Sequence, residues 1–70
     1  MSQPRLNLMR ARGTRTQEEI GRLCGVRQQT YSHWERGRST PPVDKMLLLE
    51  KVLGVPKEEL FCDVFNSNGE

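Results

Sequence analysis

Long apolar runs and clustered cysteines are missing from this sequence. The longest uninterrupted apolar run covers only residues 46–49, whereas a helix needs about 20 predominantly apolar residues to cross a bilayer. The first residues also lack the apolar stretch of a signal peptide. Cys24 and Cys62 stand far apart and belong to no CxxC or Cys/His cluster, so neither a zinc site nor a disulfide framework is indicated. We therefore expect a soluble, cytoplasmic protein with reduced thiols, no metal site, no cofactor and no membrane partner.

Recognisable catalytic groups are missing as well. The chain has 70 residues, of which 34% are hydrophobic, so its core is small and leaves little room for a buried catalytic cleft. Ser32 and His33 are neighbours in the sequence, and on a helix they point about 100° apart, so they do not form a catalytic dyad. Gly37 stands four residues after His33, where a second metal ligand would be needed. We expect binding at a surface rather than an enzyme.

Charge is present in quantity and is unevenly distributed. The net charge is only +2, but the two halves of the chain differ in sign. Residues 1–38 contain eight arginines, no lysine and three glutamates, which gives +5, whereas residues 39–70 contain three lysines and six acidic residues, which gives −3. This asymmetry favours a polyanionic partner on one face. An unevenly charged, solvated surface is the alternative.

The sequence predicts a series of short helices, and it contains no alternating pattern typical of strands. Helical spacing predicts segments at about residues 5–12, 16–24, 28–36 and 43–53, and a short fifth one begins near Pro56. A glycine closes each of the first four segments, or follows it directly. The adjacent prolines Pro41 and Pro42 interrupt the chain between the third and fourth segments. The polar tail over residues 66–70 is expected to be frayed.

Residues 16–36 have the pattern of two helices joined by a tight turn. The first opens with Thr16 and Glu19, a capping box whose hydroxyl and carboxylate satisfy free amides at the helix start. Its apolar side comprises Ile20, Leu23 and Cys24. The second helix turns three residues inward, namely Thr30, Tyr31 and Trp34. Gly21 in mid-helix costs about 1 kcal/mol relative to alanine, which makes sense if a second helix crosses closely there. A plain helical hairpin is the alternative.

Further short motifs follow this pattern at characteristic spacings. The motifs are TQEEIG at 16–21, CGV at 24–26, TYSHWERG at 30–37, Pro41, LGVP at 53–56 and ELF at 59–61. Over about residues 6–61 the chain therefore resembles the Cro and phage-repressor family of helix-turn-helix regulators. The resemblance implies an all-α, compact, five-helix, lambda-repressor-like DNA-binding domain over residues 1–65. It also implies a sequence-specific transcriptional regulator, a repressor or controller protein, whose recognition helix at about 28–36 enters the major groove of a double-stranded operator.

The resemblance also implies two sets of DNA contacts. Base edges would be read by Arg27, Gln28, Gln29, Ser32 and His33. The chemistry agrees, because glutamine can pair with adenine and arginine with guanine. Phosphates would be bound by Gln17, Arg36, Arg38, Ser39 and Thr40. Gln17 lies at the start of a helix, where free amides favour an anion.

Two features concern packing rather than DNA. The family typically pairs an arginine of the first helix with the glutamate of the WERG run, which implies a structural ion pair between Arg10 and Glu35. The chain departs from the family at Arg15, where an apolar residue usually staples the next helix, and at Glu50, where a small apolar residue usually faces the core. Either the fourth helix is rotated or Glu50 is paired.

A single small domain presents little surface for selective DNA binding, so we expect a symmetric homodimer on a roughly palindromic site. The candidate interface comprises apolar residues of the acidic half: Leu48, Val52, Leu60, Phe61, Val64 and Phe65. The alternative function is an antitoxin-like or adaptor protein that uses the same fold to hold a protein partner such as a toxin. Salt-dependent affinity for duplex DNA distinguishes the regulator from a pure adaptor.

Overall fold

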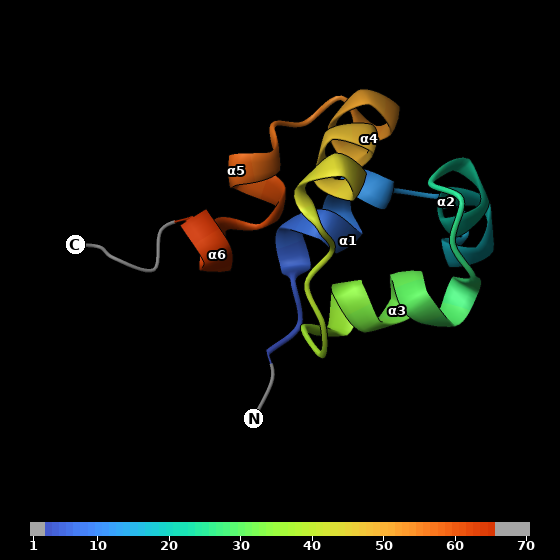
Figure 1. Ribbon diagram of the computed structural model, residues 1–70, viewed down its shortest axis with the longest axis horizontal. Coiled ribbons are helices and arrows are strands. Elements are labelled where there is room, and N and C mark those ends of the chain that lie inside the picture. Colours follow the sequence, from blue (N-terminus) through green and yellow to red (C-terminus); the bar gives the residue numbers. More distant parts are fainter. Residues whose placement is uncertain (1–2, 66–70) are drawn as a thin grey trace.

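A computed structural model describes residues 3–65, which form six helices and no strand (Figure 1). The helices are α1 (Leu6–Arg12), α2 (Gln17–Leu23), α3 (Gln28–Arg36), α4 (Val43–Leu53), α5 (Lys57–Leu60) and α6 (Cys62–Phe65). The expected all-α, lambda-repressor-like fold is confirmed. In this part of the chain no helix combines the length and the apolar character needed to span a membrane. The tail expected over 66–70 lies outside the described residues.

The expected fifth helix is divided into α5 and α6. The break lies at Phe61, whose backbone leaves helical geometry (φ −121°, ψ 48°) and whose side chain is fully buried. The chain therefore bends where Phe61 turns into the core. The expectation of five helices is wrong in this respect, because spacing alone did not show that one aromatic residue would interrupt the last segment.

Side chains and glycine set the ends of the motif helices. Thr16 Oγ1 accepts a 3.0 Å hydrogen bond from the Glu19 amide and caps α2. The reciprocal bond of the expected capping box, from the Thr16 amide to the Glu19 carboxylate, does not occur in the described residues. Gly37 ends α3 in the left-handed conformation with φ 75°, and a side chain there would also collide with the carbonyl of Gln3. Only glycine fits this position without strain.

Every helix from α1 to α5 contributes to one buried core. The buried hydrophobic residues are Leu8, Ile20, Cys24, Tyr31, Trp34, Met46, Leu49, Leu60 and Phe61. Tyr31 and Trp34 meet edge to face, with ring centroids 6.0 Å apart, a favoured aromatic geometry. Thr30, expected to face inward, is exposed, because it lies about 100° from Tyr31 around the helix and falls past the edge of the buried face.

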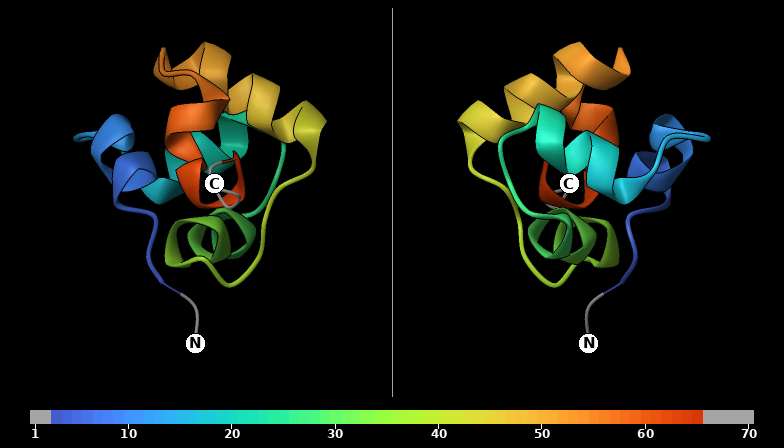
Figure 2. Two further views of the ribbon diagram at one scale, coloured as in Figure 1. Left: turned by 90° about the vertical axis from the view of Figure 1, so that its left-hand side faces the viewer. Right: turned by 90° about the vertical axis from the view of Figure 1, so that its right-hand side faces the viewer.

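The helices place α3 and α4 on opposite sides of the molecule. α2 packs on α3, and α1 contacts both α3 and α5. Both views in Figure 2 show α4 above and α3 below, with the other helices between them. One face of α3 is therefore free at one pole of the domain, and one face of α4 is free at the other.

Glu50 is paired, which decides between the two alternatives left open for the fourth helix. Its Oε2 accepts a 2.8 Å hydrogen bond from the backbone amide of Lys57, the first residue of α5. Pro56 precedes that helix and offers no side-chain cap. The Glu50 carboxylate therefore caps α5 from a neighbouring helix, at the end where a negative charge is favourable.

Candidate nucleic-acid interface

The turn between α2 and α3 packs tightly against α2 at Gly21. The Gly21 carbonyl accepts a 2.9 Å hydrogen bond from the Val26 amide, and a Cβ at Gly21 would lie 3.1 Å from the Val26 carbonyl oxygen. The expected close approach at Gly21 is therefore present, although its partner is the turn itself rather than the body of α3. This contact fixes the angle at which α3 leaves α2.

The outer face of α3 gathers most of the expected DNA-contacting residues. A shallow hollow between α2 and α3 is lined by Gln17, Gln28, Gln29, Ser32, His33 and Arg36. Arg27 precedes α3 and lines the adjacent hollow together with Gln28 and Gln29. Within residues 3–65, the side chains of the five residues expected to read bases make no hydrogen bond or ion pair. Their polar groups are available to a ligand.

The charge around this face is positive. Arg27, Arg36 and Arg38 are exposed, and Glu35, the only acidic residue of α3, is buried beneath the opposite face. Glu18 on α2 is paired with Arg22 at 3.4 Å, and both side chains are largely exposed, so this ion pair contributes little to stability. The α3 outer face thus offers hydrogen-bonding side chains flanked by arginines, which suits a polyanion.

Glu35 is held by Arg12, and not by Arg10 as expected. Arg12 Nε donates to Glu35 Oε2 at 2.6 Å, and a second guanidinium nitrogen donates to Oε1 at 3.3 Å, whereas Arg10 is exposed. The reason is helix geometry: Leu8 marks the buried face of α1, Arg12 lies one turn further on that face, and Arg10 points about 200° away from Leu8.

Gln17 belongs to the same network. Its Nε2 donates to Glu35 Oε1 at 2.8 Å. Burial by itself raises the pKa of Glu35, but the hydrogen bonds from Arg12 and Gln17 outweigh burial and leave the pKa below its ordinary value. Burial raises the pKa of the Tyr31 hydroxyl, and the nearby Glu35 carboxylate raises it further. A buried carboxylate therefore orients Gln17 at the edge of the α3 hollow.

Arg5 organises the loop after α3, a role that the sequence did not indicate. Its guanidinium donates to the carbonyls of Trp34 at 2.6 Å and Ser39 at 2.9 Å, and to Thr40 Oγ1 at 2.9 Å. It also binds both carboxylate oxygens of Asp63, at 3.0 and 3.1 Å. This arginine clasp, formed by Arg5 and these four partners, fixes the segment that carries Arg38, Ser39 and Thr40.

The arginine clasp bears on one predicted phosphate contact, that of Thr40. The Thr40 hydroxyl accepts a hydrogen bond from Arg5, so only its hydrogen is left for a phosphate. Arg5 is also almost fully buried, with its guanidinium 5.2 Å from the centre of the Phe61 ring. The only signal in the sequence was an arginine at the start of the first expected helix, and seven other arginines in the basic half obscured it.

The structure divides the candidate dimer residues into two groups. Leu60 and Phe61 are fully buried in the core, and Val52 is half-buried against it. Leu60 and Phe61 are therefore wrong as interface residues, because the monomer already covers them. Three candidates keep exposed surface: Leu48, Val64 and Phe65.

Comparison with known proteins agrees with this geometry. A helix-turn-helix family model matches residues 6–60, a range that contains α1 to α5. Searches of curated proteins and of solved structures found no match. The chain belongs to the helix-turn-helix family of the Cro and phage-repressor type, and it is a DNA-binding helix-turn-helix regulator.

Proposed function

We propose that this protein is a sequence-specific transcriptional regulator, a repressor or controller protein, that inserts α3 into the major groove of a double-stranded operator. The observation that carries the proposal is the outer face of α3. It presents Gln28, Gln29, Ser32 and His33 without internal partners, while its inner face is fixed by the core. A rigid helix with free hydrogen-bonding groups suits base recognition.

The glutamines and arginines at this face each have a defined chemical use. The amides of Gln28 and Gln29 can accept from N6 and donate to N7 of adenine, and Arg27 can reach guanine or a phosphate. Three further residues are exposed and are proposed to bind phosphates of the DNA backbone: Arg36, Arg38 and Ser39. Gln17 lines the same hollow, and the second N–H of its amide is not used by Glu35, so it can donate to a phosphate.

We propose repression as the mode of regulation. A domain seated in the major groove over a promoter blocks the polymerase, which supports repression as the basal activity. We also propose that the protein acts in the cytoplasm, together with its operator DNA. An antitoxin-like or adaptor role is the alternative, and a pure adaptor predicts no salt-dependent binding to duplex DNA.

The proposed regulator binds as a homodimer through α6. Val64 and Phe65 are exposed there, and α6 lies to one side of the α3 face (Figure 1). A two-fold axis beside α6 would leave the outer faces of both α3 helices pointing in the same direction. Binding to one face of B-DNA would then require about 34 Å between the two helices, one turn of the duplex. A two-fold axis at Leu48 would not do this, because α4 lies opposite α3.

The test begins with selection of a preferred site from a random duplex library. Replacing Gln28 or Gln29 by alanine is expected to cost roughly 1–3 kcal/mol on the selected site and little on random duplex. Thr30→Ala is the matched control, because Thr30 is exposed on α3 but lies off the hollow. Equal losses on both kinds of DNA, or a library that yields no preferred sequence, contradict the proposal.

A further inference from the structure

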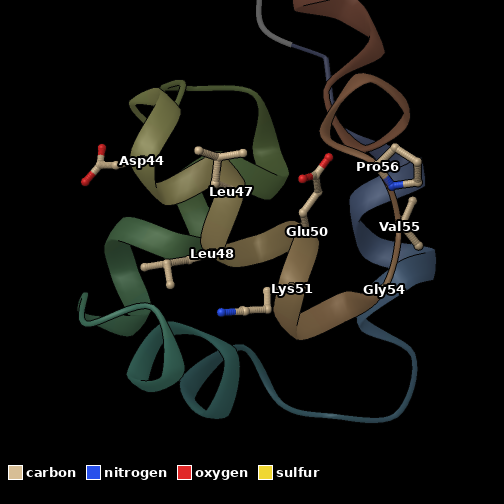
Figure 3. A pocket seen from close by; sticks show the side chains of 8 residues that line it. All are labelled: Asp44, Leu47, Leu48, Glu50, Lys51, Gly54, Val55 and Pro56. Carbon is tan, nitrogen blue, oxygen red and sulfur yellow. The ribbon is translucent and has the colours of Figure 1, made fainter.

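The outer face of α4 carries a short stripe of two leucines between two opposite charges. Asp44, Leu47, Leu48 and Lys51 follow one another at i, i+3, i+4 and i+7, a spacing that brings them onto one face of a helix. Leu47 is 48% exposed and Leu48 36%. All four line one open hollow, and Figure 3 shows their side chains along α4. We call these four residues the α4 stripe.

The two charges of the α4 stripe differ from their neighbours in having no partner. Lys45 donates to the Cys24 carbonyl at 2.9 Å, and Glu50 caps α5. Asp44 and Lys51 are exposed, and their side chains make no hydrogen bond or ion pair with any residue from 3 to 65. An unpartnered acid, two exposed leucines and an unpartnered base thus form a surface that the monomer does not use.

The α4 stripe is complementary to itself in one orientation. The point midway between Leu47 and Leu48 is also midway between Asp44 and Lys51. A two-fold axis through this point, perpendicular to α4, brings Asp44 of each copy opposite Lys51 of the other, and Leu47 opposite Leu48. We propose that a second copy of this chain docks on the α4 stripe, with the two α4 helices antiparallel. A parallel arrangement would oppose like charges.

This contact is separate from the α6 contact and serves a different purpose. α4 lies on the opposite side of the molecule from α3 (Figure 2), so two copies joined through α4 turn their α3 helices in opposite directions. If α3 binds DNA as proposed above, such a pair holds two DNA segments at once. The α4 contact itself does not depend on the proposed function, but the bridging of DNA does.

The expected affinity is low. α4 has 11 residues and is about 16 Å long, so a contact along it buries much less than the about 1,600 Å² of a standard interface. Self-association is therefore expected at high protein concentration, and it weakens as salt screens the exposed charges. On DNA, several α4 contacts between two occupied segments act together and strengthen the link.

Sedimentation equilibrium of the full chain tests the contact without DNA, in a Phe65→Asp background that removes the proposed α6 contact. Asp44→Lys and Lys51→Asp are each expected to weaken self-association at least roughly tenfold. An equimolar mixture of the two variants is expected to associate again, because each then offers the charges that the other needs. Glu59→Lys is the matched control: it reverses an exposed acidic first-turn residue of α5 that does not line the hollow of the α4 stripe, and it is expected to leave association unchanged.

Three results would overturn the proposal. The first is a chain that stays monomeric up to about one millimolar, which would leave the face to a different protein or to solvent. The second is association that Asp44→Lys and Leu48→Glu leave unchanged. The third is a mixture of charge variants that fails to recover while each variant keeps the wild-type melting temperature. Any of these excludes α4 pairing whether or not the chain binds DNA.

A bridging assay then separates the two proposals. Bead-bound duplex is expected to capture a second, labelled duplex with the same selected site when the wild-type chain is added. Asp44→Lys is expected to bind single duplexes normally but to lose capture. Loss of single-duplex binding by the wild type would contradict the proposed function instead, and capture by Asp44→Lys at the wild-type level would overturn the α4 contact.

Discussion

The Arg5 guanidinium donates to the carbonyl oxygen of Trp34 at 2.6 Å. That carbonyl lies in the last turn of α3, where carbonyls lack regular helical partners, and its other bond, from the Gly37 amide, is 3.3 Å long. The residue just before α1 therefore caps the end of the proposed recognition helix. Position and direction of α3 depend on a side chain far from it in the sequence.

Arg5→Lys is expected to destabilise the fold by roughly 2–3 kcal/mol, because a lysine cannot reproduce the planar fork and leaves buried acceptors without donors. It is also expected to weaken binding to selected and random duplex alike, since the loop with Arg38 and Ser39 loses its support. Urea unfolding and duplex titration measure the two effects. Asp63→Asn is the comparison: Asp63 is 54% exposed, and an asparagine oxygen can still accept a hydrogen bond from the guanidinium, so the loss is expected to be smaller than in Arg5→Lys. An equal loss in both variants would contradict this account.

Arg12 and Arg10 provide a paired test of the Glu35 network. Arg12→Ala leaves a buried carboxylate without its main partner, and we expect a loss of roughly 2–3 kcal/mol, below the range of a fully buried pair because the Arg12 side chain is 22% exposed. Arg10→Ala is expected to stay within about 0.5 kcal/mol of the wild type. Coupling between Arg10 and Glu35 in a double-mutant cycle would reverse the assignment.

The lowered pKa of Glu35 gives the fold a defined acid sensitivity. Because its pKa in the folded chain lies below the ordinary value of 4.5, the ionised group contributes stability that is fully present above that pH. The contribution is lost as the pH falls from 4.5 through the folded-state pKa. Urea unfolding across this range is expected to show a shallower acid loss in Glu35→Gln than in the wild type. Parallel curves for the two proteins would show that Glu35 does not control this range.

Helix positions and the motif itself could be predicted from sequence because they depend on local rules. The spacing of Tyr31 and Trp34, the Thr16 cap and the glycine after Arg36 each act over a few residues. The partner of Glu35 was also predictable in principle, since Leu8 and Arg12 share a face of α1 that Arg10 does not. The family pattern led to Arg10 as the partner of Glu35, whereas helix periodicity would have led to Arg12.

The rest depends on contacts between distant residues. Arg5 was only one of the eight arginines that indicated a polyanionic partner, and only the folded chain shows that Asp63 and the carbonyls of Trp34 and Ser39 surround it. The same holds for Leu60 and Phe61, whose burial depends on how the last helices bend onto the core. Glu50 appeared out of place in α4 until the start of α5 supplied its partner.

Gly21 offers a graded test of the turn. Alanine adds one methyl group 3.1 Å from the Val26 carbonyl, a small strain that the about 1 kcal/mol gain in helix propensity offsets. We therefore expect Gly21→Ala to stay within about 1 kcal/mol of the wild type. Gly21→Val adds two further methyl groups at the same contact and is expected to lose roughly 2–3 kcal/mol. A valine variant as stable as the alanine variant would show that the turn is not tightly packed.

The proposed α6 contact predicts how the protein assembles on its operator. Phe65→Asp is expected to bind a single half-site with the wild-type affinity but to lose cooperative binding to the full palindrome, because a charge replaces the exposed ring. Footprinting on half-sites and full sites measures both. Leu23→Asp, an exposed apolar residue on α2, is the control for added charge. An unchanged full-site footprint in Phe65→Asp would remove α6 from the dimer.

The arginine clasp bears on how the domain folds. Its hydrogen bonds join residues 29 to 58 positions apart, so it forms only after both ends of the chain have come together. Helices as short as α2 and α3, with seven and nine residues, are marginal in water on their own. A peptide cut to residues 16–36 would therefore contain the whole motif and still lack an ordered recognition helix, so the functional unit that can be grafted onto another protein is the entire domain.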